Sequence, residues 1–184
     1  MISDETAYRR YLDGDPKAAD LLVEKYGDPL MLYINGYLKD MYEAEDLMIE
    51  AFSLIFAKER PITGKGAFQA YLYKTARNLA LRHRKMCGLR ILRFEELDFE
   101  LKADALADTE LFRTERSRQL YDALEKLKPE YREALYLVYF EEMSYRNAAM
   151  VMHKSEEQIT KLVYRGKKSL KAILEREGFA YADE

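Results

Sequence analysis

Signals that start α-helices recur along this chain, and they constrain its fold more than any other feature. Such signals occur at Asp15-Pro16, Asp28-Pro29, Pro129, Ser144 and Ser155. A capping side chain accepts a hydrogen bond from a first-turn amide, and proline at the first helical position already has a helical φ. Ser155 and Gln158 also have the spacing of a capping box. Because no run alternates with the two-residue period of a strand, the sequence predicts an all-α protein.

These signals divide the first part of the chain into helices. The first predicted helix covers residues 15–26 and ends at Gly27. The second begins at Asp28-Pro29 and carries an apolar stripe at four-residue spacing. The third covers residues 42–59, and a glycine-containing loop, residues 61–66, separates it from a fourth.

The C-terminal part has the pattern of a helix-turn-helix. Ser144 caps a short predicted helix over residues 145–152, a turn follows at His153-Lys154, and Ser155 opens the last helix. A short helix, a brief turn and a capped longer helix are the layout of this motif. The alternative is an ordinary helical hairpin with a basic outer face.

Two helical domains are predicted, with an acidic linker between them. The linker covers residues 94–115, so the domains are residues 1–93 and 116–184. Further helices are expected over residues 110–127 and from Pro129 to Phe140.

Charge is distributed in blocks, although the formal net charge is only -3. Lys and Arg outnumber Asp and Glu by ten to one in residues 58–93 and by eight to three in residues 144–176. Acidic residues outnumber basic ones by twelve to five in residues 1–57 and by eight to two in residues 94–115. Two basic blocks in an acidic chain indicate two surfaces that face nucleic acid.

The first basic block contains an acid-free segment from Gly66 to Arg93 that begins with aromatic residues. Cations neutralise phosphates, and flat rings stack on exposed bases of any identity, so this pattern is typical of a single-stranded nucleic-acid site. The alternative is a solvated helix whose rings belong to the core. The residues expected to contact nucleic acid are Phe68, Tyr71, Lys74, Arg77, Asn78, Arg82, Arg84 and Lys85.

The last helix has an apolar inner face and a polar outer face. A recognition helix presents its N-terminal outward residues to base edges and its later cations to phosphates. We expect Glu157, Thr160 and Lys161 to read bases, and Arg165 and Lys168 to meet phosphates. Tyr164 lies on the same outward face.

Three segments resemble, in the right order, motifs of the extracytoplasmic-function sigma factors, the smallest members of the sigma-70 family. Residues 43–47, Glu-Ala-Glu-Asp-Leu, resemble the helix that docks on the clamp of RNA polymerase. Residues 68–78 resemble the segment that melts and reads the minus-ten promoter element. Residues 127–135, with Met-Ser-Tyr at 143–145 and the last helix, resemble the region that reads the minus-thirty-five element. The chain departs from the family pattern at Ile49, Tyr71, His153, Thr160 and Leu162.

The resemblance implies a sigma factor that binds core RNA polymerase and promoter DNA and has no active site of its own. It implies that polymerase is held by Asp46, Leu47, Glu50 and Phe52. It also implies an anti-sigma protein as a further partner. Two alternatives are a free-standing helix-turn-helix regulator that binds operators, and a polymerase-binding protein that no longer selects promoters.

Composition excludes several other classes. The apolar content of 48% and the charged content of 34% are typical of a globular protein, and no segment is long and apolar enough to predict a membrane span. The first residues lack the pattern of a signal peptide, so a cytoplasmic location is expected. His83 and His153 are far apart, and no motif for a phosphate loop or nucleophile is present, so neither a metal nor a cofactor is predicted.

Overall fold

The computed structural model describes residues 2–87 and 115–179, and every regular element in these ranges is helical. An N-terminal group of helices comprises α1 (Asp4–Leu12), α2 (Pro16–Leu38), α3 (Met41–Phe56) and α4 (Ala67–Met86). A C-terminal group comprises α6 (Glu115–Glu125), α7 (Pro129–Leu135), the π-helical turn η3 (Tyr136–Phe140), α8 (Tyr145–Met152) and α9 (Glu156–Arg176). The all-α prediction is confirmed.

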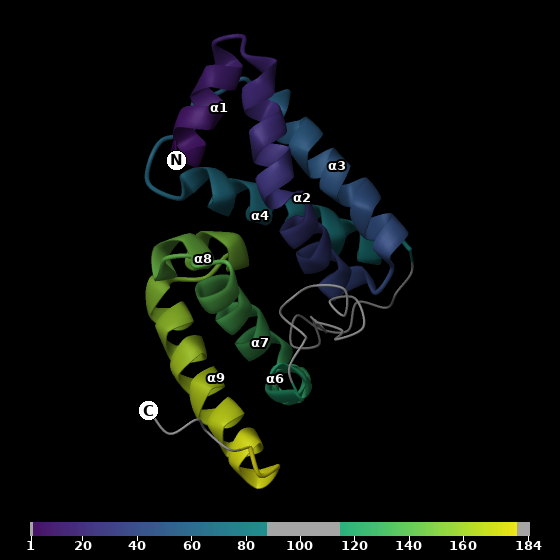
Figure 1. The fold of residues 1–184 in the computed structure, drawn as a ribbon, viewed down its shortest axis with the longest axis vertical. Helices are drawn as coiled ribbons and strands as arrows, with labels where there is room; N and C mark the ends of the chain where they lie inside the picture. The colour runs from purple at the N-terminus through teal and green to yellow at the C-terminus, as the bar shows by residue number, and fades with distance from the viewer. Residues whose placement is uncertain (1, 88–114, 180–184) are drawn as a thin grey trace.

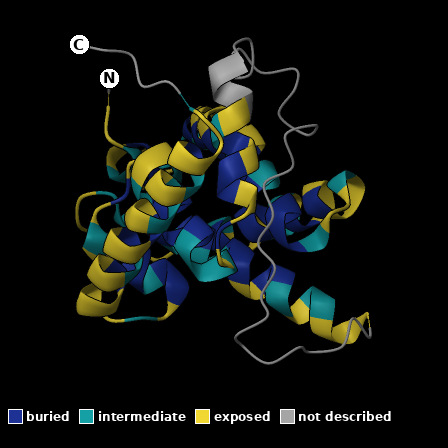
Figure 2. Ribbon diagram, turned by 90° about the horizontal axis from the view of Figure 1, so that it is seen from below, coloured by how far each residue is buried: buried dark blue, intermediate teal, exposed yellow. Residues whose placement is uncertain are grey.

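The two groups lie against each other, with α4 on the side of the N-terminal group that faces α8 (Figure 1). Within the N-terminal group, α2 packs on α1, α3 and α4. In the C-terminal group, α9 packs on α6, α7 and α8. Figure 2 shows that buried residues gather where helices face one another and that the outer faces are exposed. One continuous set of buried side chains runs through both groups.

Helix α2 corrects the prediction of a break at Gly27. It is continuous from Pro16 to Leu38, with Pro29 inside it. An internal proline costs a helix about 3 kcal/mol, because it removes one hydrogen bond and crowds the preceding turn. The buried stripe of this helix continues across the proline, from Leu22 and Tyr26 to Leu30 and Ile34. Burying a side chain of this size contributes about 1.5–3 kcal/mol, so the stripe outweighs the local penalty.

Helix α1 was not predicted, although its start signal is present in the sequence. The Ser3 side chain accepts a hydrogen bond from the Thr6 amide, and Asp4 and Glu5 lie in the first turn. Tyr8 is buried, and its hydroxyl donates to the Ile55 carbonyl over 3.0 Å. This helix therefore closes one side of the N-terminal core.

The helix-turn-helix prediction is confirmed in detail. Ser144 caps α8, His153 ends it in the left-handed conformation, and Ser155 and Gln158 form the capping box of α9. The helix predicted from Pro129 to Phe140 is instead α7 followed by η3. The wider turn buries both Tyr136 and its neighbour Leu137.

The predicted linker and the end of the basic segment cannot be compared, because residues 88–114 lie outside the described ranges. The domain boundaries at residues 93 and 116 therefore stay predictions. The third predicted helix is α3, which ends at Phe56 rather than at residue 59, and the loop before α4 is confirmed.

Phe68 corrects another prediction. Its side chain is completely buried, with ring centroids 5.3 Å from Tyr8 and 6.1 Å from Tyr26. A ring in this position cannot stack on a base, so the alternative assignment of Phe68 to the core is right. The reason is its place in the first turn of α4, directly beneath α1.

We predict that Phe68→Ala lowers the free energy of unfolding by about 3–5 kcal/mol, because it leaves a cavity in the aromatic core. Phe68→Leu keeps most of the volume and serves as the matched control, with an expected loss below about 1.5 kcal/mol. Urea unfolding followed by circular dichroism measures both. Equal stabilities for Phe68→Ala and the wild type would contradict this core assignment.

Candidate nucleic-acid interface

The predicted contact residues of α4 divide into three classes by exposure. Asn78, Arg82 and Lys85 are exposed, whereas Tyr71, Lys74 and Arg84 are half-buried. Arg82 also forms an ion pair with Glu50 of α3, with 3.0 Å between Nη2 and Oε1. Phe68 and Arg77 are buried, Phe68 inside the N-terminal core and Arg77 against the C-terminal group. The helix thus offers a basic face of which one part is covered.

Arg77 is covered by a carboxylate from the other group of helices. Its Nε lies 2.8 Å from Oε1 of Glu133 on α7, and both side chains are at most 5% exposed. The Tyr33 hydroxyl donates to the same oxygen over 2.8 Å, and the Tyr37 hydroxyl donates to it as well. Three donors from the N-terminal group therefore converge on one carboxylate oxygen of the C-terminal group.

The protonation states of this cluster follow from burial and proximity. Burial on its own would lower the pKa of Arg77, but Tyr37 and Glu133 beside it raise that pKa above its ordinary value. Burial raises the pKa of Tyr33 and Tyr37, and the Glu133 carboxylate raises it further. The guanidinium is therefore charged, and both tyrosines are neutral donors.

A second contact between the two groups of helices is made by Glu141, the residue directly after η3. The Tyr73 hydroxyl of α4 donates to Oε2 of Glu141 over 2.5 Å, and the Gln69 amide donates to its backbone carbonyl over 2.9 Å. Burial raises the pKa of the Glu141 carboxyl, while hydrogen bonds from Tyr73, Tyr136 and Gln69 act in the opposite direction. The rings of Tyr33 and Tyr136 stack between the groups, with centroids 5.9 Å apart.

The helix-turn-helix also touches α4 and the loop before it. The Asn147 amide of α8 donates to the carbonyls of Lys65 and Gly66 over 3.3 Å and 3.2 Å. His153, in the turn between α8 and α9, lies 3.0 Å from Oδ1 of Asn78. Partial burial, Lys74 and Arg77 lower the pKa of His153. Its ring is therefore neutral near pH 7.

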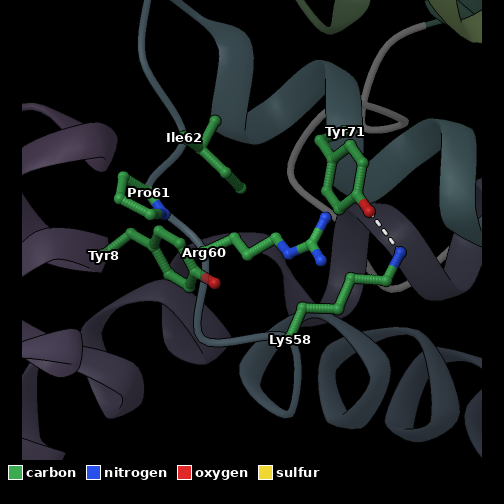
Figure 3. Close-up of a pocket in the computed structure, with 6 residues that line it drawn as sticks. All are labelled: Tyr8, Lys58, Arg60, Pro61, Ile62 and Tyr71. Atoms are coloured by element: carbon green, nitrogen blue, oxygen red, sulfur yellow. Dashed lines mark hydrogen bonds between the residues drawn. The ribbon is translucent and has the colours of Figure 1, made fainter.

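A pocket of about 580 Å³ opens between α1, the end of α3 and the loop that leads to α4. It is lined by Tyr8, Lys58, Arg60, Pro61, Ile62 and Tyr71 (Figure 3). The Lys58 ammonium donates to the Tyr71 hydroxyl and lies 4.9 Å from the centroid of that ring. Figure 3 shows Arg60 and Lys58 pointing toward the same space as the Tyr71 ring. Two rings, an aliphatic wall and two cations suit a nucleotide better than a wholly apolar ligand.

Sequence reasoning did not single out Lys58 and Arg60, although both lie in the basic block of residues 58–93. The signal was available: two cations precede Pro61 in a loop, while Tyr71 follows in the first turns of α4. What the sequence could not provide was the distance between these two segments. In the folded protein α3 packs on α4, and this packing brings the two segments together.

Helix α9 presents the second basic face. Glu157, Thr160, Lys161, Tyr164, Arg165 and Lys168 are all exposed, as predicted. The Lys161 ammonium lies 2.6 Å from Oε1 of Glu157. A hydrogen bond from Lys161 lowers the pKa of Glu157. The opposite face is buried through Ile159, Val163 and Gly166.

The predicted polymerase-docking residues on α3 need a correction. Asp46 is exposed and Glu50 is half-buried, but Leu47 and Phe52 are buried in the N-terminal core. Both belong to the buried set of α3 together with Ala44, Ala51 and Ile55, so neither can touch a partner. The exposed apolar residues of α3 are instead Tyr42, Ile49 and Leu54. Tyr42, Asp46 and Ile49 are four and three residues apart, so they share one face of the helix.

Within the described ranges, no helix is long and apolar enough to cross a membrane. The same residues contain no group of three or more histidine, cysteine, aspartate or glutamate side chains that could hold a metal ion.

Comparison with known proteins identifies both groups of helices. The family model for sigma-70 region 2 matches residues 22–86, and the model for sigma-70 region 4 matches residues 117–170. Over 181 residues, the chain is 29% identical to the RNA polymerase sigma-H factor of Pseudomonas aeruginosa, with 94% of each chain covered. It is 24% identical to the ECF RNA polymerase sigma factor SigM of Bacillus subtilis, over 85% of this chain and 95% of that protein.

The fold is similar to that of CnrH, solved in complex with the cytosolic domain of CnrY. The TM-score is 0.65 and the sequence identity is 19%, with 94% of this chain and 97% of that chain covered.

Glu141 leads to a prediction about pH. Because its pKa is raised in the folded protein, the native state holds this proton more tightly than the unfolded state does. The resulting stabilisation is present below about pH 4.3, the ordinary pKa of a glutamate, and is lost as the pH rises through the raised value. Glu141→Gln cannot ionise, so its stability relative to the wild type should increase between about pH 4 and pH 7.

Urea unfolding at a series of pH values measures this difference. The control Glu142→Gln makes the same change in net charge at an exposed neighbouring position. If the stability difference between Glu141→Gln and the wild type is the same at all pH values, the buried environment of Glu141 is wrongly described.

Proposed function

Because the chain belongs to the sigma-70 family and is an RNA polymerase sigma factor that directs transcription initiation, we propose a division of labour among three of its helices. Helix α3 docks on core polymerase, α4 with the preceding loop opens and reads the minus-ten element, and α9 reads the minus-thirty-five element. The observation that supports this most is the pair of basic outer faces on α4 and α9, in a chain that is acidic overall.

We assign the polymerase contact to the exposed face of α3. Tyr42 and Ile49 are 84% and 53% exposed, and Asp46 lies between them on the same face. An exposed aromatic and an aliphatic residue beside carboxylates form the mixed surface typical of protein–protein interfaces. Glu50 belongs at the edge of this face, where its ion pair with Arg82 joins α3 to α4.

The minus-ten role rests on the pocket and on the cations that follow it. Tyr71 offers the face on which a base can stack once it leaves the duplex, and Lys58 and Arg60 are placed to hold its phosphate. Lys74, Arg82, Arg84 and Lys85 continue along α4 and neutralise the backbone of the same strand. Arg77 and Asn78 would also contact this strand when the C-terminal group is displaced from α4.

The minus-thirty-five role rests on α9. Its N-terminal outward residues Glu157, Thr160 and Lys161 are exposed for base edges, and Arg165 and Lys168 follow for phosphates. Tyr164 extends the same surface. Because Lys161 pairs with Glu157 in the free protein, this pair has to open or rearrange when a base replaces one partner.

The catalytic chemistry belongs to the polymerase in this account, so the chain needs no active site of its own. It acts where the polymerase acts, in the cytoplasm. An anti-sigma protein that holds the factor inactive is a further proposed partner, supported by the family to which the chain belongs.

The pocket leads to a prediction about strand opening. Tyr71→Ala should reduce the open-complex population roughly ten- to hundredfold, because base–aromatic stacking contributes about 1–3 kcal/mol. Initial docking should change little, since the helix cations remain. Permanganate footprinting of unpaired thymines measures opening, and a gel shift measures the closed complex.

Tyr71→Phe keeps the ring and is the matched control for the Tyr71→Ala variant. A template with a pre-melted bubble should rescue Tyr71→Ala if opening is its defect. Equal losses on bubble and duplex templates, with an unchanged melting temperature, would remove strand opening from the role of this ring.

Helix α9 leads to a prediction about promoter selection. Lys161→Glu should relax sequence preference at one upstream position and cost about 1–3 kcal/mol of binding. Arg165→Glu should lower the binding affinity equally for all DNA sequences, and it should make that affinity less dependent on salt concentration. Both variants should bind core polymerase as the wild type does. The assignment of minus-thirty-five recognition to α9 would be refuted if both variants transcribed at the wild-type level from a promoter that depends on its minus-thirty-five element.

A further inference from the structure

The first turns of α9 carry three chemically different side chains on one exposed face. Glu157 lies three residues before Thr160 and four before Lys161, so all three share this face, and all three are exposed. In the proposed role of α9 they are the first side chains of the helix to reach base edges. Their contacts in the free protein determine which groups each can offer to a base.

The charged pair matches the pattern of donors and acceptors on one base pair. The Lys161 ammonium lies 2.6 Å from Oε1 of Glu157, so the ends of the two side chains meet at one place on the face. The carboxylate only accepts hydrogen bonds, and the ammonium only donates them. In the major groove guanine presents two acceptors, O6 and N7, and its partner cytosine presents an amino donor. A G·C pair can therefore satisfy both side chains when it replaces their contact with each other.

The Thr160 side chain offers a methyl group, because its hydroxyl is already engaged. Its Oγ1 donates to the Glu156 carbonyl over 2.9 Å, one turn back along the helix. A hydroxyl has a single hydrogen to donate, so the methyl group remains for a contact in the groove. Thymine carries a methyl group on its major-groove edge. Thr160 is also one of the positions at which the chain departs from the family pattern.

We propose that the first turns of α9 read a G·C base pair beside a thymine. Lys161 donates to the guanine, Glu157 accepts from the cytosine of the same pair, and the Thr160 methyl group packs on the methyl group of a neighbouring thymine. The inference rests on the proposed function of α9 and adds the bases that it selects. Arg165 and Lys168 lie further along the same face, and their phosphate contacts are the same for every sequence.

Selection from a library of duplex promoters tests these bases. The library keeps one minus-ten element and has randomised bases upstream, and the holoenzyme of the full chain and core polymerase selects from it. We expect a G·C pair beside a thymine in the selected element. Replacing the guanine by 7-deazaguanine removes N7 and should lower affinity roughly tenfold. Replacing the thymine by uracil removes only the methyl group and should lower affinity about fourfold, the effect of about 0.8 kcal/mol.

Two substitutions of Thr160 separate its methyl group from its hydroxyl. Thr160→Val keeps a methyl group and removes the hydroxyl, whereas Thr160→Ser keeps the hydroxyl and removes the methyl group. We expect Thr160→Val to retain the preference for thymine over uracil and Thr160→Ser to lose it. The readout is the ratio of the affinities for the two templates, which a merely structural role of Thr160 would leave unchanged. In the same way, Lys161→Met should bind the guanine and 7-deazaguanine templates equally.

The proposal is overturned if the selected element lacks the G·C pair or the thymine, or if Thr160→Ser keeps the thymine preference. Failure of the underlying function is separately visible through Arg165→Glu. If this reversal weakens upstream binding while the base analogues have no effect, α9 still meets DNA and only the assignment of bases is refuted. If no upstream sequence is selected and Arg165→Glu changes nothing, the proposed function of α9 fails and the inference fails with it.

Discussion

The ion pair between Arg77 and Glu133 is the contact on which the observed arrangement depends. Its two ends come from different groups of helices, and each is almost completely removed from water. A buried charge without a partner is so unfavourable that neither side chain can stay in place without the other. The hydroxyls of Tyr33 and Tyr37 complete the coordination of the carboxylate, and the stacked rings of Tyr33 and Tyr136 extend the contact into the core.

This arrangement has unequal consequences for the two basic faces. The outer residues of α9 remain open to solvent, whereas Arg77 and part of the surrounding α4 face are covered. The pocket around Tyr71 lies near the N-terminal end of α4, next to α1 and the α3–α4 loop. The face of α9 proposed to recognise the upstream element is therefore exposed while the two groups are packed together, whereas Arg77 on the proposed DNA face of α4 is not.

The sequence was most informative where local chemistry decides the structure. The caps at Ser144 and Ser155 act within a few residues, and the helix-turn-helix was predictable from them. Rules based on neighbouring residues gave wrong predictions where contacts between residues far apart in the sequence determine the structure. The buried stripe of α2 overrides Pro29, and α1 packs over Phe68 and so places a ring expected at DNA inside the core. Nothing in the spacing of residues 77 and 133 indicates that they meet, because their contact depends on how the two groups dock.

The distance between the two groups, before and after core polymerase binds, tests the central claim most directly. Spin labels at the exposed positions Glu24 of α2 and Ala172 of α9, with Cys87 replaced by serine, allow pulsed electron paramagnetic resonance on the full chain. The account predicts one narrow distance distribution in the free protein and a distribution centred on a different distance in the holoenzyme. The same distance distribution in both states would contradict it.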